Sequence, residues 1–134
     1  MSKLPLVVAG GAVVALGLGV ALVGPRPGLA AGHPEPRPGI TAERVLPRSM
    51  VPSSPGTLEA YEAARRVPQV LDGIYCHCNC SKSIGHRSLL TCFETNHGAG
   101  CDVCMGEAML AAQMHASGNS LAQIRKAIDA KWGS

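Results

Sequence analysis

Residues 76–80 read Cys-His-Cys-Asn-Cys, and residues 101–104 read Cys-Asp-Val-Cys. Together with Cys92 between them, these two runs contain all six cysteines of a 134-residue chain. A domain of this size buries too little apolar surface to be stable on burial alone, and it usually needs a metal ion or disulfides. The chain around the two runs therefore has to fold so that the cysteines meet.

Histidines lie among these cysteines, which points to a metal site. Thiolate and imidazole together select zinc, copper(I) or iron–sulfur clusters over magnesium or calcium. The spacing is not that of a zinc finger, a c-type haem site or a ferredoxin. The sequence predicts a site for zinc or copper(I), with ligands drawn from Cys76, His77, Cys78, Cys80, His86, Cys92, His97, Cys101 and Cys104.

The second run is expected to stand at the start of a helix, where free amides and the positive helix pole lower a thiol pKa. Cys101 and Cys104, with Cys78 and Cys80, would complete one tetrahedral site. The 76–80 run then has one thiol too many. That surplus indicates either several metal ions bridged by sulfur or a disulfide to Cys92.

Two other functions compete with metal binding. An even number of cysteines in a small exported domain is typical of a disulfide scaffold, in which residues 76, 78 and 80 would pair with residues 92, 101 and 104. Alternatively, Cys101 and Cys104 could exchange thiols and disulfides. No paired carboxylates, nucleophilic serine elbow or phosphate loop is visible, so an enzyme is not the expectation. Glu107 is interpreted as an exposed helix carboxylate.

Residues 56–134 are predicted to form an all-α domain of three or four short helices. Ser54 and Pro55 are expected to begin the first helix, which ends or restarts near Pro68. Further helices are expected over residues 87–93 and 101–116. The last has a capping box, Ser120 with Gln123, followed by an apolar stripe at Leu121, Ile124, Ile128 and Trp132.

The N-terminal part divides into an anchor and a linker. Residues 4–24 are 21 consecutive uncharged positions, long enough to cross a bilayer, and residues 1–24 are predicted to be an uncleaved signal anchor. A cleaved signal with a site near Ala30 is the alternative. Residues 25–55 contain eight prolines and are predicted to be an extended spacer, with His33 solvated.

Charge and location exclude one class of partner and favour another. Residues 56–134 hold seven basic and seven acidic side chains and few aromatic ones, so nucleic-acid binding is not expected. The anchor predicts a single-pass membrane protein with its domain outside the cytoplasm. Gly11, Ala15 and Gly19 form a small-residue face that could contact another membrane helix in a complex.

The order of three alternating cysteines, then Cys92-Phe93, then Cys101-Asp-Val-Cys104 with Glu107-Ala108, resembles bacterial exported domains named for a PCYCGC motif. The resemblance covers residues 57–132. Three positions of the motif depart from it: Tyr75, His77 and Asn79 replace Pro, Tyr and Gly. Many such proteins look like lipoproteins, whereas no cysteine follows the hydrophobic segment here. The resemblance implies export to the bacterial cell surface and a shared cysteine set, but no reaction.

Overall fold

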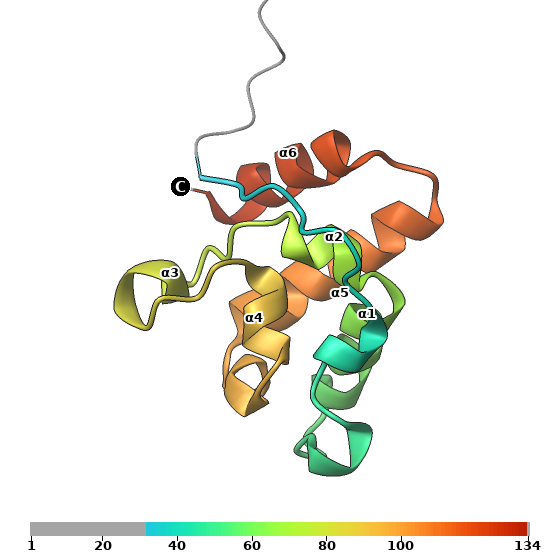
Figure 1. Ribbon diagram of the computed structural model, residues 1–134, viewed down its shortest axis with the longest axis vertical. Coiled ribbons are helices and arrows are strands. Elements are labelled where there is room, and N and C mark those ends of the chain that lie inside the picture. Colours follow the sequence, from blue (N-terminus) through green and yellow to red (C-terminus); the bar gives the residue numbers. More distant parts are fainter. Residues whose placement is uncertain (1–31, 134) are drawn as a thin grey trace, which may run out of the picture.

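The computed structural model describes residues 32–133, and this part of the chain contains helices and no strand. Figure 1 shows six α-helices around a small core, with α3 projecting from the others on a long loop. The α-helices are α1 (Thr57–Arg66), α2 (Pro68–Asp72), α3 (Cys80–Ser83), α4 (Leu89–Phe93), α5 (Asp102–Ala116) and α6 (Leu121–Trp132). Three 3-10 helices accompany them: η1 (Ala42–Arg44), η2 (Arg48–Met50) and η3 (Asn96–Gly100).

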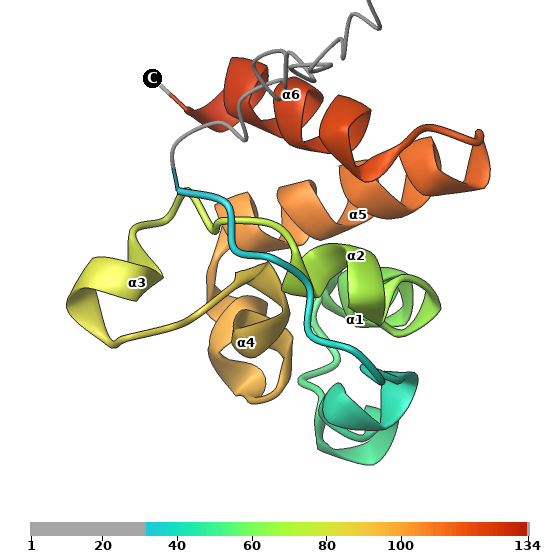
Figure 2. The same cartoon turned by 45° about the horizontal axis from the view of Figure 1, so that its top comes forward.

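The longest helix, α5, lies at the centre of the fold. It packs against α1 on one side and against α6 on the other, and α6 runs alongside it in Figure 2. The core between them is aromatic at one point only, where Tyr61 and Phe93 meet edge to face with their ring centroids 4.9 Å apart. The Tyr61 hydroxyl donates to the Thr95 carbonyl at 2.6 Å, so its polar end is satisfied inside the core.

The all-α prediction is confirmed for the described residues, and α6 matches its prediction most closely. Ser120 and Gln123 form the capping box in both directions. Ile124 and Ile128 are fully buried, and Leu121 and Trp132 pack against the core from its edge. The restart at Pro68 is also confirmed, since α2 begins at that residue.

Two local predictions were wrong. Helix α1 begins at Thr57 and not at Pro55, because Gly56 precedes it with a left-handed φ of 77° and the Ser54 hydroxyl bonds the Thr57 hydroxyl instead of a backbone amide. The fold also has more helices than the predicted three or four. Helix α3 is a single turn and therefore too short to show a 3.6-residue period.

The described part of the proline-rich segment, residues 32–55, packs on the domain, which corrects the predicted solvated spacer. Val45 and Val51 are buried. The amide and the guanidinium Nη2 of Arg37 each donate to the Asp72 carboxylate at 2.7 Å. His33 is also buried, where its Nδ1 accepts from the Tyr75 amide at 2.9 Å. Prolines prevent a helix or ladder here, but an extended chain can still lay its side chains on a surface.

The predicted signal anchor lies outside the described residues. Between residues 32 and 133, none of the helices has the length and apolar character required to cross a membrane.

Candidate metal centre

Two overlapping groups of metal-binding side chains meet beside α5. In each group the donor atoms lie within 4.8 Å of one another. The first group contains only sulfur, from Cys76, Cys78, Cys80, Cys92 and Cys104. The second group mixes sulfur and nitrogen, from Cys80, His86, Cys92 and His97. The two groups share two cysteines, so the seven side chains form one continuous cluster, called here the thiolate–imidazole cluster.

Short elements from several parts of the chain deliver these ligands. Cys76 and Cys78 lie in the loop after α2, Cys80 begins α3, Cys92 lies in α4, and Cys104 lies in the first turn of α5. Asn79 adopts a left-handed φ of 62°, which asparagine tolerates better than most residues, and this turn places Cys78 beside Cys80. The two sulfurs lie at disulfide distance, and the other four cysteines are free thiols. The alternative three-disulfide pairing is therefore not formed.

The spacing of the sulfurs matches what a metal ion requires. Cys76 Sγ lies 3.2 Å from Cys78 Sγ, 3.3 Å from Cys104 Sγ and 3.7 Å from Cys92 Sγ. Cys78 Sγ lies 3.5 Å from Cys104 Sγ. Zinc–sulfur bonds of about 2.3 Å in a tetrahedron put neighbouring sulfurs about 3.8 Å apart. The sulfurs are thus close to the arrangement of a tetrahedral sulfur site.

The two imidazoles approach the opposite side of the cluster. His97 Nε2 lies 3.0 Å from Cys80 Sγ, and His86 Nδ1 lies 3.3 Å from Cys92 Sγ. Their ring centroids are 4.9 Å apart. Burial lowers the pKa of His86, as does the neighbouring His97, so the ring favours its neutral, metal-binding form.

The sulfurs are buried, and their charges are coupled. Cys92 and Cys104 are completely buried. Hydrogen bonds from Cys104 and Cys92 lower the pKa of Cys76, and the same bonds with Cys76 and Cys92 raise the pKa of Cys104. The empty cluster therefore holds its negative charge on few of its sulfurs, because like charges repel strongly in a buried site. A bound cation would stabilise the remaining thiolates.

A buried carboxylate, Glu107, stands beside the cluster. Its Oε1 accepts from the His77 amide at 3.1 Å and lies 2.6 Å from His77 Nδ1. Its Oε2 is buried and has no hydrogen-bond partner among the described residues. Burial, and then the charge of Cys76, raise the pKa of Glu107 to about 9. The interpretation of Glu107 as an exposed helix carboxylate was therefore wrong.

Two predicted ligands are not part of the cluster. His77 belongs to neither group, because its ring lies between two carboxylates, with Nε2 3.1 Å from Asp129 Oδ1. Cys101 also belongs to neither group. It precedes α5 in extended backbone, whereas Cys104 lies on the buried face of the helix. The predicted four-ligand set with Cys101 is thus not assembled, and Cys76 and Cys92 lie beside Cys104 in its place.

One signal in the sequence could have identified Glu107. The buried face of α5 contains Cys104, Glu107, Ala108, Ala111 and Ala112. This is the i, i+3, i+4, i+7 spacing of one helix face, and the glutamate falls on it between a ligand and small core residues. No comparable pattern marked His33 or Asp129, whose contact at 2.9 Å joins residues far apart in the chain.

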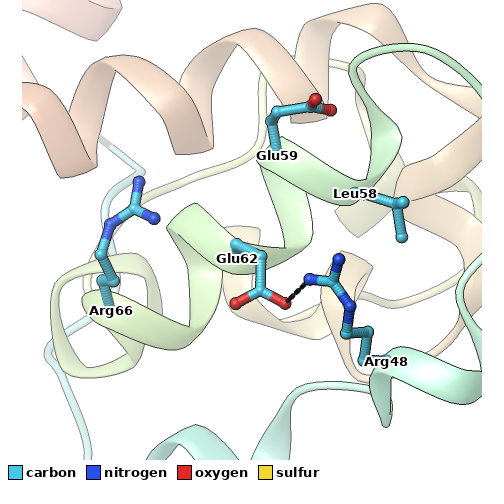
Figure 3. Close-up of a pocket in the computed structure, with 5 residues that line it drawn as sticks. All are labelled: Arg48, Leu58, Glu59, Glu62 and Arg66. Carbon is cyan, nitrogen blue, oxygen red and sulfur yellow. Dashed lines mark hydrogen bonds and ion pairs between the residues drawn. The ribbon is translucent and has the colours of Figure 1, made fainter.

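A separate hollow on the surface is not part of this site. It lies beside α1 and is lined by Arg48, Leu58, Glu59, Glu62 and Arg66 (Figure 3). Arg48 Nη1 and Glu62 Oε1 are paired across it at 2.7 Å. None of the lining residues belongs to either ligand group, so the buried cluster is the better candidate for function.

Comparison with known proteins supports the cysteine pattern but names no reaction. No curated protein and no solved structure matches the chain. Residues 39–134, more than two thirds of the chain, match the family described as "Protein of unknown function with PCYCGC motif". The matched region includes every member of the thiolate–imidazole cluster. The chain belongs to the PCYCGC-motif family of proteins of unknown function.

Proposed function

We propose that this protein is a metal-binding module for zinc or copper(I), held on the outer side of a bacterial membrane by its N-terminal segment. The observation that carries the proposal is the meeting of five sulfurs and two imidazoles within bonding reach of common points. Soft and borderline transition metals prefer this set of ligands. The role would be to buffer or hand over the ion, or to stabilise the domain.

Burial favours metal binding over thiol–disulfide exchange. A catalytic thiol needs access to its substrate and a lowered pKa. Cys104 is completely buried and has a raised pKa because of its hydrogen bonds with Cys76 and Cys92. Cys101, its intended partner, stands outside the cluster. The pair expected to exchange disulfides therefore lacks both the accessibility and the mutual contact that this chemistry requires.

The location is argued from residues 4–24, which carry no charge and are long enough to span the hydrocarbon core. An exported domain would meet metal ions outside the cytoplasm. The described residues begin at Gly32 and lie against the domain from there, with His33 near Asp129 of α6. The proposed tether would therefore hold the domain close to the bilayer surface.

The test is native mass spectrometry with elemental analysis of the full chain, purified in detergent with reductant and without chelator. We expect bound zinc or copper and thiols that do not react with alkylating agents. Cys104→Ser should lower the metal content, whereas Cys101→Ser should leave it unchanged and serves as the matched control. Metal-free wild-type protein that binds neither ion on titration would contradict the proposal.

A further inference from the structure

We infer that the thiolate–imidazole cluster binds two ions that share the sulfur of Cys92. This inference rests on the proposed function and specifies the ligand arrangement at the same site. One ion would take sulfur alone, from Cys76, Cys78, Cys104 and Cys92. The other would take Cys80, His86, His97 and again Cys92.

The number of ligands supports two ions. The cluster offers five sulfurs and two imidazoles, which is seven donors. A single tetrahedral ion uses four, so three buried or half-buried donors would remain without a metal. Two tetrahedral ions need eight positions, and seven donors fill them when one thiolate bridges. Thiolate sulfur can bridge two ions because it has several lone pairs, whereas a neutral imidazole offers one to a metal.

The geometry identifies Cys92 as the bridge. Its Sγ lies 3.7 Å from Cys76 Sγ on the all-sulfur side and 3.9 Å from Cys80 Sγ on the mixed side. It also lies 3.3 Å from His86 Nδ1. Cys92 belongs to both groups, and it is completely buried on α4.

The other shared cysteine, Cys80, is placed in the mixed half by its closest imidazole. Its Sγ lies 3.0 Å from His97 Nε2. Cys78 instead lies near the two sulfurs that are farthest along the all-sulfur side, 3.2 Å from Cys76 and 3.5 Å from Cys104. The pair Cys78 and Cys80 therefore divides between the two ions when both are reduced.

Charge favours divalent ions of the zinc type. Five thiolates carry five negative charges, and two divalent ions leave a single excess negative charge in the buried cluster. One divalent ion, or two monovalent ones, would leave three. Uncompensated charge is costly in a buried site. Tetrahedral sites built from sulfur alone or from sulfur and nitrogen are typical of zinc.

The experiment loads the reduced full chain in detergent with zinc and measures zinc per chain by native mass spectrometry and elemental analysis. We expect two ions in the wild type and in the Cys101→Ser control. The double variant His86→Ala/His97→Ala should retain one. One ion in the wild type would overturn the paired site but leave the proposed function intact. No zinc, and no copper on a parallel titration, would overturn the proposed function itself.

The bridge is tested without a variant by replacing zinc with cobalt(II). Two cobalt(II) ions that share a thiolate couple magnetically, so the paramagnetic resonance signal should rise with the first equivalent and fall with the second. A signal that grows in proportion through both equivalents would overturn the shared sulfur. Cys92→Ser provides a second check, since it should lose affinity for both ions; retention of two tightly bound ions would also overturn it.

Discussion

Substitution of Glu107 by alanine is expected to weaken metal binding, although Glu107 is not a ligand. The carboxylate lies one turn after Cys104 on α5 and accepts from both the amide and the ring of His77. His77 stands between Cys76 and Cys78 in the ligand loop. Glu107 therefore connects the loop to the helix that carries Cys104, and it acts as a positioning residue for three sulfurs at once.

The expected size follows from the two contacts. A hydrogen bond to a charged group contributes about 1.5–3 kcal/mol and an ordinary one about 1 kcal/mol, and leaving the buried His77 amide unpaired costs about as much again. At about 1.4 kcal/mol for each tenfold change, the loss in metal affinity should be roughly 10- to 100-fold, in the range found for partners that orient ligands. Glu107→Gln keeps one oxygen acceptor and should lose roughly tenfold or less.

The assay is competition for zinc against a chromophoric chelator at neutral pH, with far-ultraviolet circular dichroism to verify folding. Glu59 is an exposed glutamate of α1, and Glu59→Ala is the matched control. Affinity of Glu107→Ala within about twofold of wild type, measured while Cys104→Ser loses zinc, would refute the positioning role. A loss as large in Glu59→Ala would show that general charge, and not the contact with His77, sets the affinity.

Three further changes test the fold around the site. Removal of metal with a strong chelator should unfold most of the domain, as followed by loss of helical dichroism; an unchanged spectrum would contradict a structural role for the ion. Burial raises the pKa of Asp72, but hydrogen bonds from Arg37 and the charge of Arg87 outweigh it and lower the pKa overall. The stability that Asp72 contributes is therefore present above its unfolded pKa of about 3.9 and is lost as pH falls through the folded value. Urea unfolding should show wild type more stable than Asp72→Asn at pH 6, with the difference narrowing below about pH 4; a difference independent of pH would argue against it. Gly106→Ala would place Cβ 2.9 Å from the Trp132 ring and should destabilise the α5–α6 contact by about 1–3 kcal/mol in the same assay; a stability equal to wild type would show that Trp132 moves freely.

The sequence predicted helix class and much of the helix placement because those signals are local. The capping box at Ser120 and the apolar stripe with Ile124 and Ile128 need only neighbours in the chain, and both are present. The start of α1 was misplaced because Gly56 caps it in a left-handed conformation that composition does not reveal. Proline content correctly indicated that most of residues 32–55 lacks long helices, but it did not indicate that Val45 and Val51 are buried.

The sequence by itself determined the chemistry of the donors, because thiols and imidazoles crowded into one short stretch favour soft metals wherever they point. Tertiary structure decided which of them meet. Cys101 and Cys104 are neighbours in the chain, yet only Cys104 faces the core, because Cys101 precedes the helix in extended backbone. Cys92 joins both halves of the cluster because α4 packs beside α5, and Glu107 holds His77 because the loop crosses that helix. Such contacts join residues far apart in sequence, so no local pattern encodes them.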